Sequence, residues 1–172
     1  MYSLDNKNFF MYLNPHYLNF RLFNTGKYDL NKRQCWFSKR AINYVESKIS
    51  SVTEVLEIGG GGSTLFFSNR VKHIDTVEDS LEWKTKITDL LFKDNVTFFD
   101  YNNYPINKKY DLILIDGKER LKFLTEVKSY LKPRGIIVFD NLEQYPSVKP
   151  NKEFSGWVQG AGKIFTGVFE SV

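Results

Sequence analysis

The sequence feature best suited to holding a ligand is a run of glycines that follows a short apolar segment. The segment from Val55 to Ile58 ends in the four glycines Gly59 to Gly62, and a helical pattern begins at Ser63. Glycines between a strand and a helix let the backbone approach a ligand closely, while the N–H groups of the helix face it. Without a ligand the same run is a tight structural turn, but the strand before it and the helix after it favour a binding site.

The spacing of the glycines and an acid just before them indicate which cofactor the turn could serve. A dinucleotide site is typically G-x-G-x-x-G, whose last glycine allows close packing of helix on strand. Here Gly59 and Gly61 are followed by Thr64 at the position of that last glycine. Glu57, two residues before Gly59, is expected to point an anion into the crevice. Such an anion would repel a pyrophosphate and attract a cofactor that carries a sulfonium and an ammonium group.

A second acid is placed to bind a nucleoside. Glu78 ends the next apolar segment of the chain. A carboxylate at the end of a second strand can accept hydrogen bonds from ribose hydroxyls. The alternative is a solvated acid beside Asp79.

Oxygen-bearing side chains also follow two later apolar segments. Asp116 comes after residues 112–115, and Asp140 and Asn141 come after residues 136–139. Two carboxylates and an amide oxygen suit Mg²⁺ or a similar ion, which could lower the pKa of an acceptor hydroxyl. The alternative is that these residues cap turns and build the loops.

An alternation of strands and helices could bring these residues to one edge of a sheet. Strand patterns cover residues 54–58, 73–77, 96–99, 110–115, 136–139, 154–159 and 163–172, and helical patterns cover 36–49, 63–70, 81–92 and 118–131. The alternation predicts an α/β fold, namely a Rossmann-like, doubly wound, mostly parallel seven-stranded sheet with helices on both faces and an antiparallel C-terminal strand. Residues 1–172 are expected to form a single domain, with a core at 36–172 and an N-terminal lid or cap segment at 1–35.

The order Glu57-x-Gly59-x-Gly61, followed by an acid after the second strand and another after the third, resembles class I S-adenosylmethionine-dependent methyltransferases over about residues 36–172. This resemblance implies that S-adenosyl-L-methionine is the cofactor. The residues that it assigns to cofactor binding are Glu57, Gly59 and Gly61 for the methionine portion, Ser63 in place of the family's third glycine, Glu78 for the ribose, Asp100 and Tyr101 for the adenine edge, and Asp116 near the sulfonium. Asp100 could equally cap the turn that follows it.

Asp116, Asp140 and Asn141 also resemble the ligand set of metal-dependent O-methyltransferases, among them the catechol and macrolide-sugar types. That resemblance implies Mg²⁺ or another divalent cation at these three residues, and a small hydroxylated metabolite as the acceptor. Asp116 and Lys118 would be the catalytic residues. In the catechol-type enzymes the basic lysine lies one residue further from the first aspartate, so Lys118 departs from that pattern.

Composition argues against several classes of partner. The net charge is +4, and Lys and Arg are interleaved with acids rather than clustered as a nucleic-acid-binding face would need. Cys35 is the only cysteine, which excludes an internal disulfide and a cysteine-rich zinc site. No apolar run approaches the roughly 20 residues that span a bilayer, and the N-terminus lacks a signal-peptide pattern. We therefore expect a cytoplasmic protein without membrane contact, and the sequence leaves its oligomeric state open.

Other functions stay open at this stage. A macromolecule methyltransferase is one, although residues 116–120 lack the Pro-Pro-aromatic turn of amino-methylating nucleic-acid enzymes. A non-catalytic cofactor-binding or partner protein would keep Glu57 and Glu78 without a productive acceptor pocket. An NAD(P) oxidoreductase is the weakest alternative because of Glu57. Arg120 either binds an anionic substrate or lies on a helix face, and Trp83 is expected to be a packing residue.

Overall fold

The computed structural model describes residues 29–35, 37–105, 107–145, 147–148, 154–161 and 164–171. Most of the expected lid or cap at 1–35 therefore lies outside the described residues. The helices are α3 (Lys39–Lys48), α4 (Gly62–Ser68), α5 (Leu81–Thr88) and α6 (Arg120–Val127), with 3₁₀ turns η1 (Leu30–Lys32), η2 (Lys128–Tyr130) and η3 (Leu142–Gln144). Among these described helices, none combines the length and the apolar character needed to cross a membrane.

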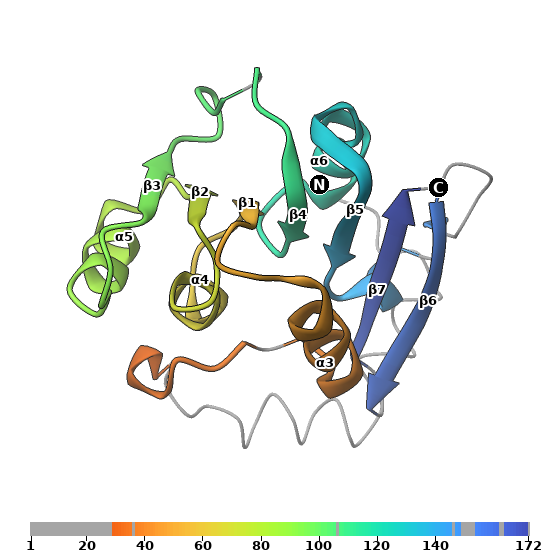
Figure 1. Cartoon of the computed structure of the whole chain (residues 1–172), viewed down its shortest axis with the longest axis horizontal. Helices are drawn as coiled ribbons and strands as arrows, with labels where there is room; N and C mark the ends of the chain where they lie inside the picture. The colour runs from red at the N-terminus through yellow and green to blue at the C-terminus, as the bar shows by residue number, and fades with distance from the viewer. Residues whose placement is uncertain are drawn as a thin grey trace, which may run out of the picture.

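Within the described residues, seven strands form one sheet. They are β1 (Glu54–Ile58), β2 (His73–Val77), β3 (Val96–Phe99), β4 (Tyr110–Ile115), β5 (Leu131–Phe139), β6 (Phe154–Ala161) and β7 (Ile164–Ser171). Their order is β3-β2-β1-β4-β5-β7-β6 (Figure 1). Pairing is parallel from β3 to β5 and antiparallel where β7 meets β5 and β6. The predicted α/β fold is confirmed, including the antiparallel C-terminal end.

The strand order reverses between β1 and β4. The chain runs outward from β1 to β2 and β3, and then returns to place β4 on the other side of β1. In an open α/β sheet, ligands bind outside the carboxyl ends of the strands at such a switch point. The glycine turn follows β1 and Asp116 follows β4, so both lie at this position.

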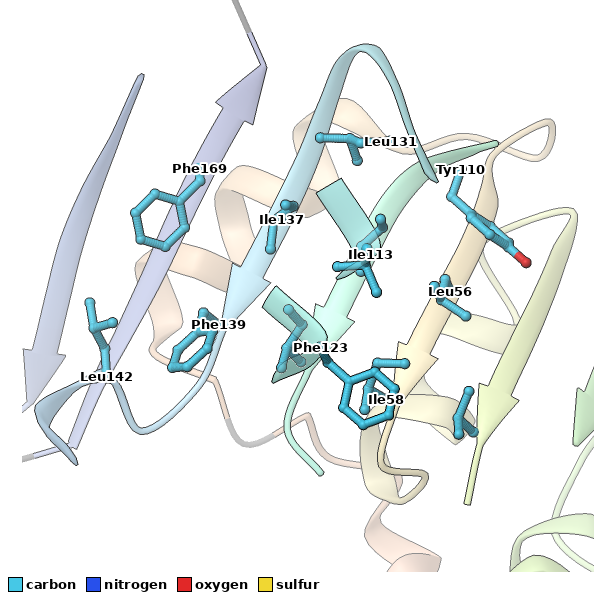
Figure 2. Close-up of a cluster of buried hydrophobic side chains, with 13 residues drawn as sticks. Leu56, Ile58, Tyr110, Ile113, Phe123, Leu131, Ile137, Phe139, Leu142 and Phe169 are labelled. Atoms are coloured by element: carbon cyan, nitrogen blue, oxygen red, sulfur yellow. The ribbon is translucent and has the colours of Figure 1, made fainter. Parts of the chain in front are cut away.

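Alternate residues of the central strands enter two apolar clusters, one on each face of the sheet. Leu56 and Ile58 of β1 pack in one cluster with Phe123 of α6 (Figure 2). Val55 packs in the other cluster with Phe67 of α4 and with residues of α3. Successive side chains of a strand point to opposite faces, so helices on both sides bury the whole strand. This burial explains why the central strands are read as continuous apolar runs.

The region between α6 and β5 differs from the sequence-based expectation. A helix was expected over 118–131 and a strand from 136, whereas α6 ends at Val127 and β5 already begins at Leu131. The strand register is irregular between Tyr110 and Leu112 of β4, opposite this part of β5. Pro133 has no N–H for a ladder hydrogen bond, so regular pairing resumes only after it.

Candidate functional site

A cavity of about 440 Å³ opens at the carboxyl ends of the strands on either side of the switch point. We call it the switch-point cavity. Its lining residues are Asp29, Leu30 and Gln34 at η1; Gly59, Gly60, Gly61, Gly62 and Ser63 after β1; Glu78, Trp83 and Tyr101 after β2 and β3; and Asp116, Gly117, Lys118, Arg120 and Asn141 after β4 and β5. The sequence-predicted residues Gly59, Gly61, Ser63, Glu78, Tyr101, Asp116, Lys118 and Asn141 are thus brought together.

The first glycine of the turn is required by its backbone conformation and by its neighbour. Gly59 has a φ of 92°, a region that residues with a side chain rarely adopt. Its N–H donates to the carbonyl of Val77 at 2.9 Å. A Cβ at position 59 would lie 2.5 Å from the Cα of Gly117, so the turns after β1 and β4 touch through two glycines. Any side chain here would separate the two turns that form the floor of the cavity.

Glu57 lies behind this turn rather than in the cavity. Its side chain is fully buried, and its carboxylate accepts hydrogen bonds from the hydroxyls of Ser63 at 2.5 Å, Thr64 at 2.6 Å and Thr76 at 3.0 Å. The Thr64 hydroxyl in turn accepts the N–H of Gly61 at 2.8 Å. The expectation that Glu57 points an anion into the crevice therefore differs from the structure, since three hydroxyl donors satisfy the carboxylate beneath the turn.

The buried position alters the acidity of Glu57. Burial raises its pKa to about 7, against the opposing effect of the hydrogen bonds from Ser63, Thr64 and Thr76, and the negative charge of Glu78 adds to the rise. The loss of hydration disfavours the charged carboxylate more than the hydroxyls favour it. Glu57 is therefore a group whose charge changes near neutral pH.

The side chains after β2 and β3 give the cavity an acidic and an aromatic residue. Glu78 is partly exposed, and one of its carboxylate oxygens accepts the N–H of Ser80 at 2.9 Å. Tyr101 packs edge-on against Phe123, with ring centroids 5.3 Å apart, and its hydroxyl accepts the N–H of Lys118 at 3.1 Å. These contacts hold both side chains in place beside the cavity.

Asp100, like Glu57, is an assigned cofactor residue that lies away from the cavity lining. Its carboxylate pairs with the ammonium of Lys84 at 2.5 Å, and its carbonyl accepts the N–H of Asn103 at 3.0 Å. The side chain is about two thirds exposed, at 66%. The structure therefore supports the alternative that Asp100 closes a turn, and of the two residues assigned to the adenine edge only Tyr101 lines the cavity.

Trp83 was expected only to pack, but in the structure it also contacts the glycine turn. Its indole N–H donates to the carbonyl of Gly60 at 2.6 Å, which ties α5 to the glycine turn. It also lines the cavity. The contact was not readable from the sequence because 23 residues separate the two partners.

Arg120 occupies the place expected for a metal ion. Its guanidinium donates to the Asn141 side-chain oxygen at 2.7 Å, and to the carbonyl and the carboxylate of Asp116 at 2.8 and 2.6 Å. The third expected ligand, Asp140, is buried and accepts the hydroxyl of Thr166 at 2.9 Å. Asp140 is also absent from the cavity lining.

The expected set of Asp116, Asp140 and Asn141 therefore does not fit a divalent ion in this structure. A cationic side chain already holds the oxygens of two of these residues, and a second cation beside it would be repelled. Within the described part of the chain, no cluster of three or more His, Cys, Asp or Glu side chains is arranged to hold a metal. Arg120 was expected to bind an anionic substrate or to lie on a helix face, and neither expectation connects it with these oxygens.

Asp116 combines access to the cavity with an altered acidity. Its side chain is 31% exposed. Burial of the carboxyl group and the nearby charge of Asp140 raise the pKa of Asp116, while the Arg120 guanidinium opposes this rise. The result is a carboxyl group at the cavity that is more basic than an ordinary aspartate.

The raised pKa of Glu57 predicts a pH-dependent stability. The folded protein favours the protonated carboxyl, so this contribution is complete below the ordinary pKa of 4.5 and is lost as pH rises through about 7. The free energy of unfolding of the wild type, relative to Glu57→Gln, should fall by about 3 kcal/mol between about pH 5 and pH 8. Urea unfolding at several pH values measures this difference.

Glu82 provides the control for that measurement. Lys86 lowers the pKa of this exposed carboxyl, so the free energy of unfolding of the wild type relative to Glu82→Gln should show no such decline as pH rises. A pH-independent difference between the wild type and Glu57→Gln would mean that Glu57 stays charged in the folded protein.

Comparison with known proteins identifies the fold. No protein-family model matches the chain, and no curated protein sequence matches it. A putative O-methyltransferase from Klebsiella pneumoniae superposes with a TM-score of 0.61 at 16% identity, covering 84% of this chain and 88% of that chain.

Two further solved structures show the same likeness. A tRNA methyltransferase from Aquifex aeolicus gives a TM-score of 0.60 at 14% identity, covering 84% of this chain and 75% of that chain. A putative methyltransferase from Streptococcus mutans, in complex with SAH, gives a TM-score of 0.59 at 13% identity, covering 78% of this chain and 97% of that chain. At this identity the likeness concerns the fold alone, and the chain has the Rossmann-like α/β fold of these solved methyltransferase structures.

Proposed function

We propose that the protein is an S-adenosylmethionine-dependent methyltransferase that methylates an oxygen of a small hydroxylated acceptor. The observation that carries this proposal is the composition of the switch-point cavity, where a glycine turn, a carboxylate after β2 and a tyrosine after β3 line one space. The Streptococcus mutans neighbour that is in complex with SAH has the same fold, which supports this choice of cofactor.

The residues present fit this cofactor. The cavity volume of about 440 Å³ lies within the range of small-molecule sites. Residues 59–62 are all glycines and line the cavity, so no side chain of the turn keeps a ligand away from its backbone. Glu78 has one oxygen bonded to Ser80, and its other oxygen has no hydrogen-bond partner within the described residues, which leaves it to accept from ribose hydroxyls.

The protein's own part in the reaction is to align the acceptor oxygen with the methyl group and to accept a proton from the acceptor. When bound, S-adenosylmethionine supplies a methyl group on a positively charged sulfur, and holding the acceptor oxygen in line with it provides much of the rate. Asp116 follows β4 beside Gly117, which touches the glycine turn. Its carboxylate is therefore placed to favour positive charge at the turn, and its raised pKa suits acceptance of the acceptor's proton.

Arg120 and Lys118 take the part that a metal ion was expected to play. Arg120 supplies a fixed positive charge between the loops after β4 and β5. Lys118 places a second cationic residue in the cavity lining. We therefore propose a metal-independent reaction, in which these side chains bind the acceptor.

Two other functions remain to be distinguished by experiment. A macromolecule methyltransferase is compatible with the fold, because the Aquifex aeolicus neighbour is a tRNA methyltransferase. A non-catalytic cofactor-binding protein would bind the cofactor and never consume it. Incubation with methyl-labelled cofactor and separate small-molecule and RNA fractions of a cell extract distinguishes these cases, and we expect label in the small-molecule fraction.

Replacement of Glu78 tests the cofactor assignment. Glu78→Ala should weaken binding of S-adenosylhomocysteine by about tenfold to a hundredfold, because the carboxylate that accepts the ribose hydroxyls is lost. Titration calorimetry measures the affinity. The matched control is Glu82→Ala, which removes an exposed glutamate of α5 that pairs with Lys86. Equal affinities for Glu78→Ala and the wild type would overturn the ribose assignment, and tighter binding of NAD or NADP would overturn the proposed function.

Added Mn²⁺ tests whether Asp116 and Asn141 can hold a divalent ion. Mn²⁺ added to ¹⁵N-labelled protein saturated with S-adenosylhomocysteine should leave the amide signals of Asp116 and Asn141 no broader than those of remote residues. The reason is that Arg120 already holds the oxygens that the ion would need. Selective broadening of these two signals, reversed by EDTA, would restore the metal site.

A further inference from the structure

We infer that the methyl acceptor carries an anionic oxygen group, a carboxylate or a phosphate, and that Arg120 binds this group at the β5 side of the switch-point cavity. The inference rests on the proposed function, because it takes the glycine turn and Glu78 as the cofactor end of the cavity. It adds the chemical class of the acceptor, which the fold does not specify.

The position of Arg120 separates it from the ribose end. In the sheet, β2 lies on one side of β1, whereas β4 and β5 lie on the other. Glu78 follows β2, and Arg120 contacts Asn141 after β5. Along the sheet from β2 to β5, Asp116 follows β4, and Arg120 contacts both Asp116 and Asn141. The guanidinium is therefore at the end of the cavity that remains for the acceptor.

The hydrogen bonding of Arg120 is incomplete. Its side chain is only 12% exposed, and the residue lines the cavity. Two of its nitrogens donate to Asp116 and Asn141, but the buried Nε has no partner among the described residues. A buried guanidinium N–H without an acceptor is costly, and an anionic oxygen is the acceptor that an arginine binds best.

The charges of the cavity point the same way. Asp116 is the carboxylate that balances Arg120 in the structure, at 2.6 Å. In the proposed function the same carboxylate also faces the positive groups of the cofactor. Lys118 adds a further cation to the lining. Among the lining residues that follow β4 and β5, Arg120 and Lys118 share the single carboxylate of Asp116, although the charge of the buried Asp140 also acts there. An anionic acceptor would place a further counter-charge beside the two cations.

The acceptor end also offers little to an apolar molecule. The lining residues that follow β4 and β5 are Asp116, Gly117, Lys118, Arg120 and Asn141, and beside them the Tyr101 hydroxyl accepts the N–H of Lys118. All of them are polar, charged or glycine, so the described surface favours a small polar acceptor with a charged group. This surface suits a hydroxy acid or a sugar phosphate better than a flat hydrocarbon ring.

A matched pair of ligands tests the inference on the wild-type protein. Lactate and lactamide have the same size and hydroxyl but differ in the carboxylate. With the protein saturated with S-adenosylhomocysteine, lactate should bind at least about tenfold more tightly than lactamide and shift the NMR signal of the Arg120 Nε–H. Inorganic phosphate should compete with lactate. Equal binding of lactate and lactamide overturns the inference, even if every Arg120 variant fails to fold.

Variants then show whether Arg120 binds an anionic group of the acceptor or the carboxylate of the cofactor, which is also an anionic oxygen group. Arg120→Gln should abolish the preference for lactate, Arg120→Lys should keep part of it, and Lys122→Gln, an exposed cation of α6 paired with Glu119, should keep all of it. S-adenosylhomocysteine and 5′-methylthioadenosine differ in the amino-acid portion. If Arg120→Gln weakens only the former and leaves lactate binding intact, Arg120 serves the cofactor and the inference is wrong. Failure of the wild type to bind S-adenosylhomocysteine would refute the proposed function instead.

Discussion

The hydrogen bonds to the buried carboxylate of Glu57 are the constraint on which the site depends. Glu57 comes from β1, Ser63 and Thr64 come from α4, and Thr76 comes from β2. The Glu57 side chain therefore joins β1 and β2 to the start of α4. The glycine turn between them is held from behind, so its cavity side needs no side chain. This arrangement allows Gly59 to approach Gly117 and brings the turns after β1 and β4 into contact.

Arg120 organises the opposite end of the cavity in a similar way. It joins the loops after β4 and β5 through oxygens of Asp116 and Asn141. Because the connecting group is a cation, the loops carry a positive charge where a metal ion would otherwise supply one. The cavity is thus acidic near Glu78 and basic near Lys118 and Arg120, with Asp116 between them. This distribution of charge orients a positively charged cofactor and a negatively charged acceptor along one axis.

The fold was predictable because its evidence is local. The alternation of apolar strands with helical segments, together with a glycine turn after β1, is sufficient to predict a parallel sheet and its switch point. The start of β5 at Leu131 was missed because its irregular pairing opposite Tyr110 and Leu112 is a tertiary effect. Sequence reasoning also placed Gly59, Glu78, Tyr101 and Asp116 correctly at one edge of the sheet, since all of them follow strands.

The roles of single charged side chains were harder to predict, because they depend on partners that the sequence does not place. Glu57 follows the acid position of the family pattern, but its buried hydroxyl partners include Thr76, which is 19 residues away. The carboxylate of Asp100 pairs with Lys84, which is 16 residues away in the sequence, and not with a group at the cavity. Arg120 and Asp116 are only four residues apart in the sequence, so their closeness was predictable, although Asp116 lies in the turn before α6 and outside the helix. The contact of Arg120 with Asn141 had no such signal in the sequence.

A crystal structure of the protein with S-adenosylhomocysteine is the most direct test of the cofactor site. We predict that the ligand lies in the switch-point cavity, with its ribose at Glu78 and its sulfur between the glycine turn and Asp116. Arg120 should remain on the acceptor side, without contact to the ligand's carboxylate. A ligand bound instead in the cavity lined by Lys32, Arg33 and Arg70, or one whose ribose faces away from Glu78, would contradict this assignment.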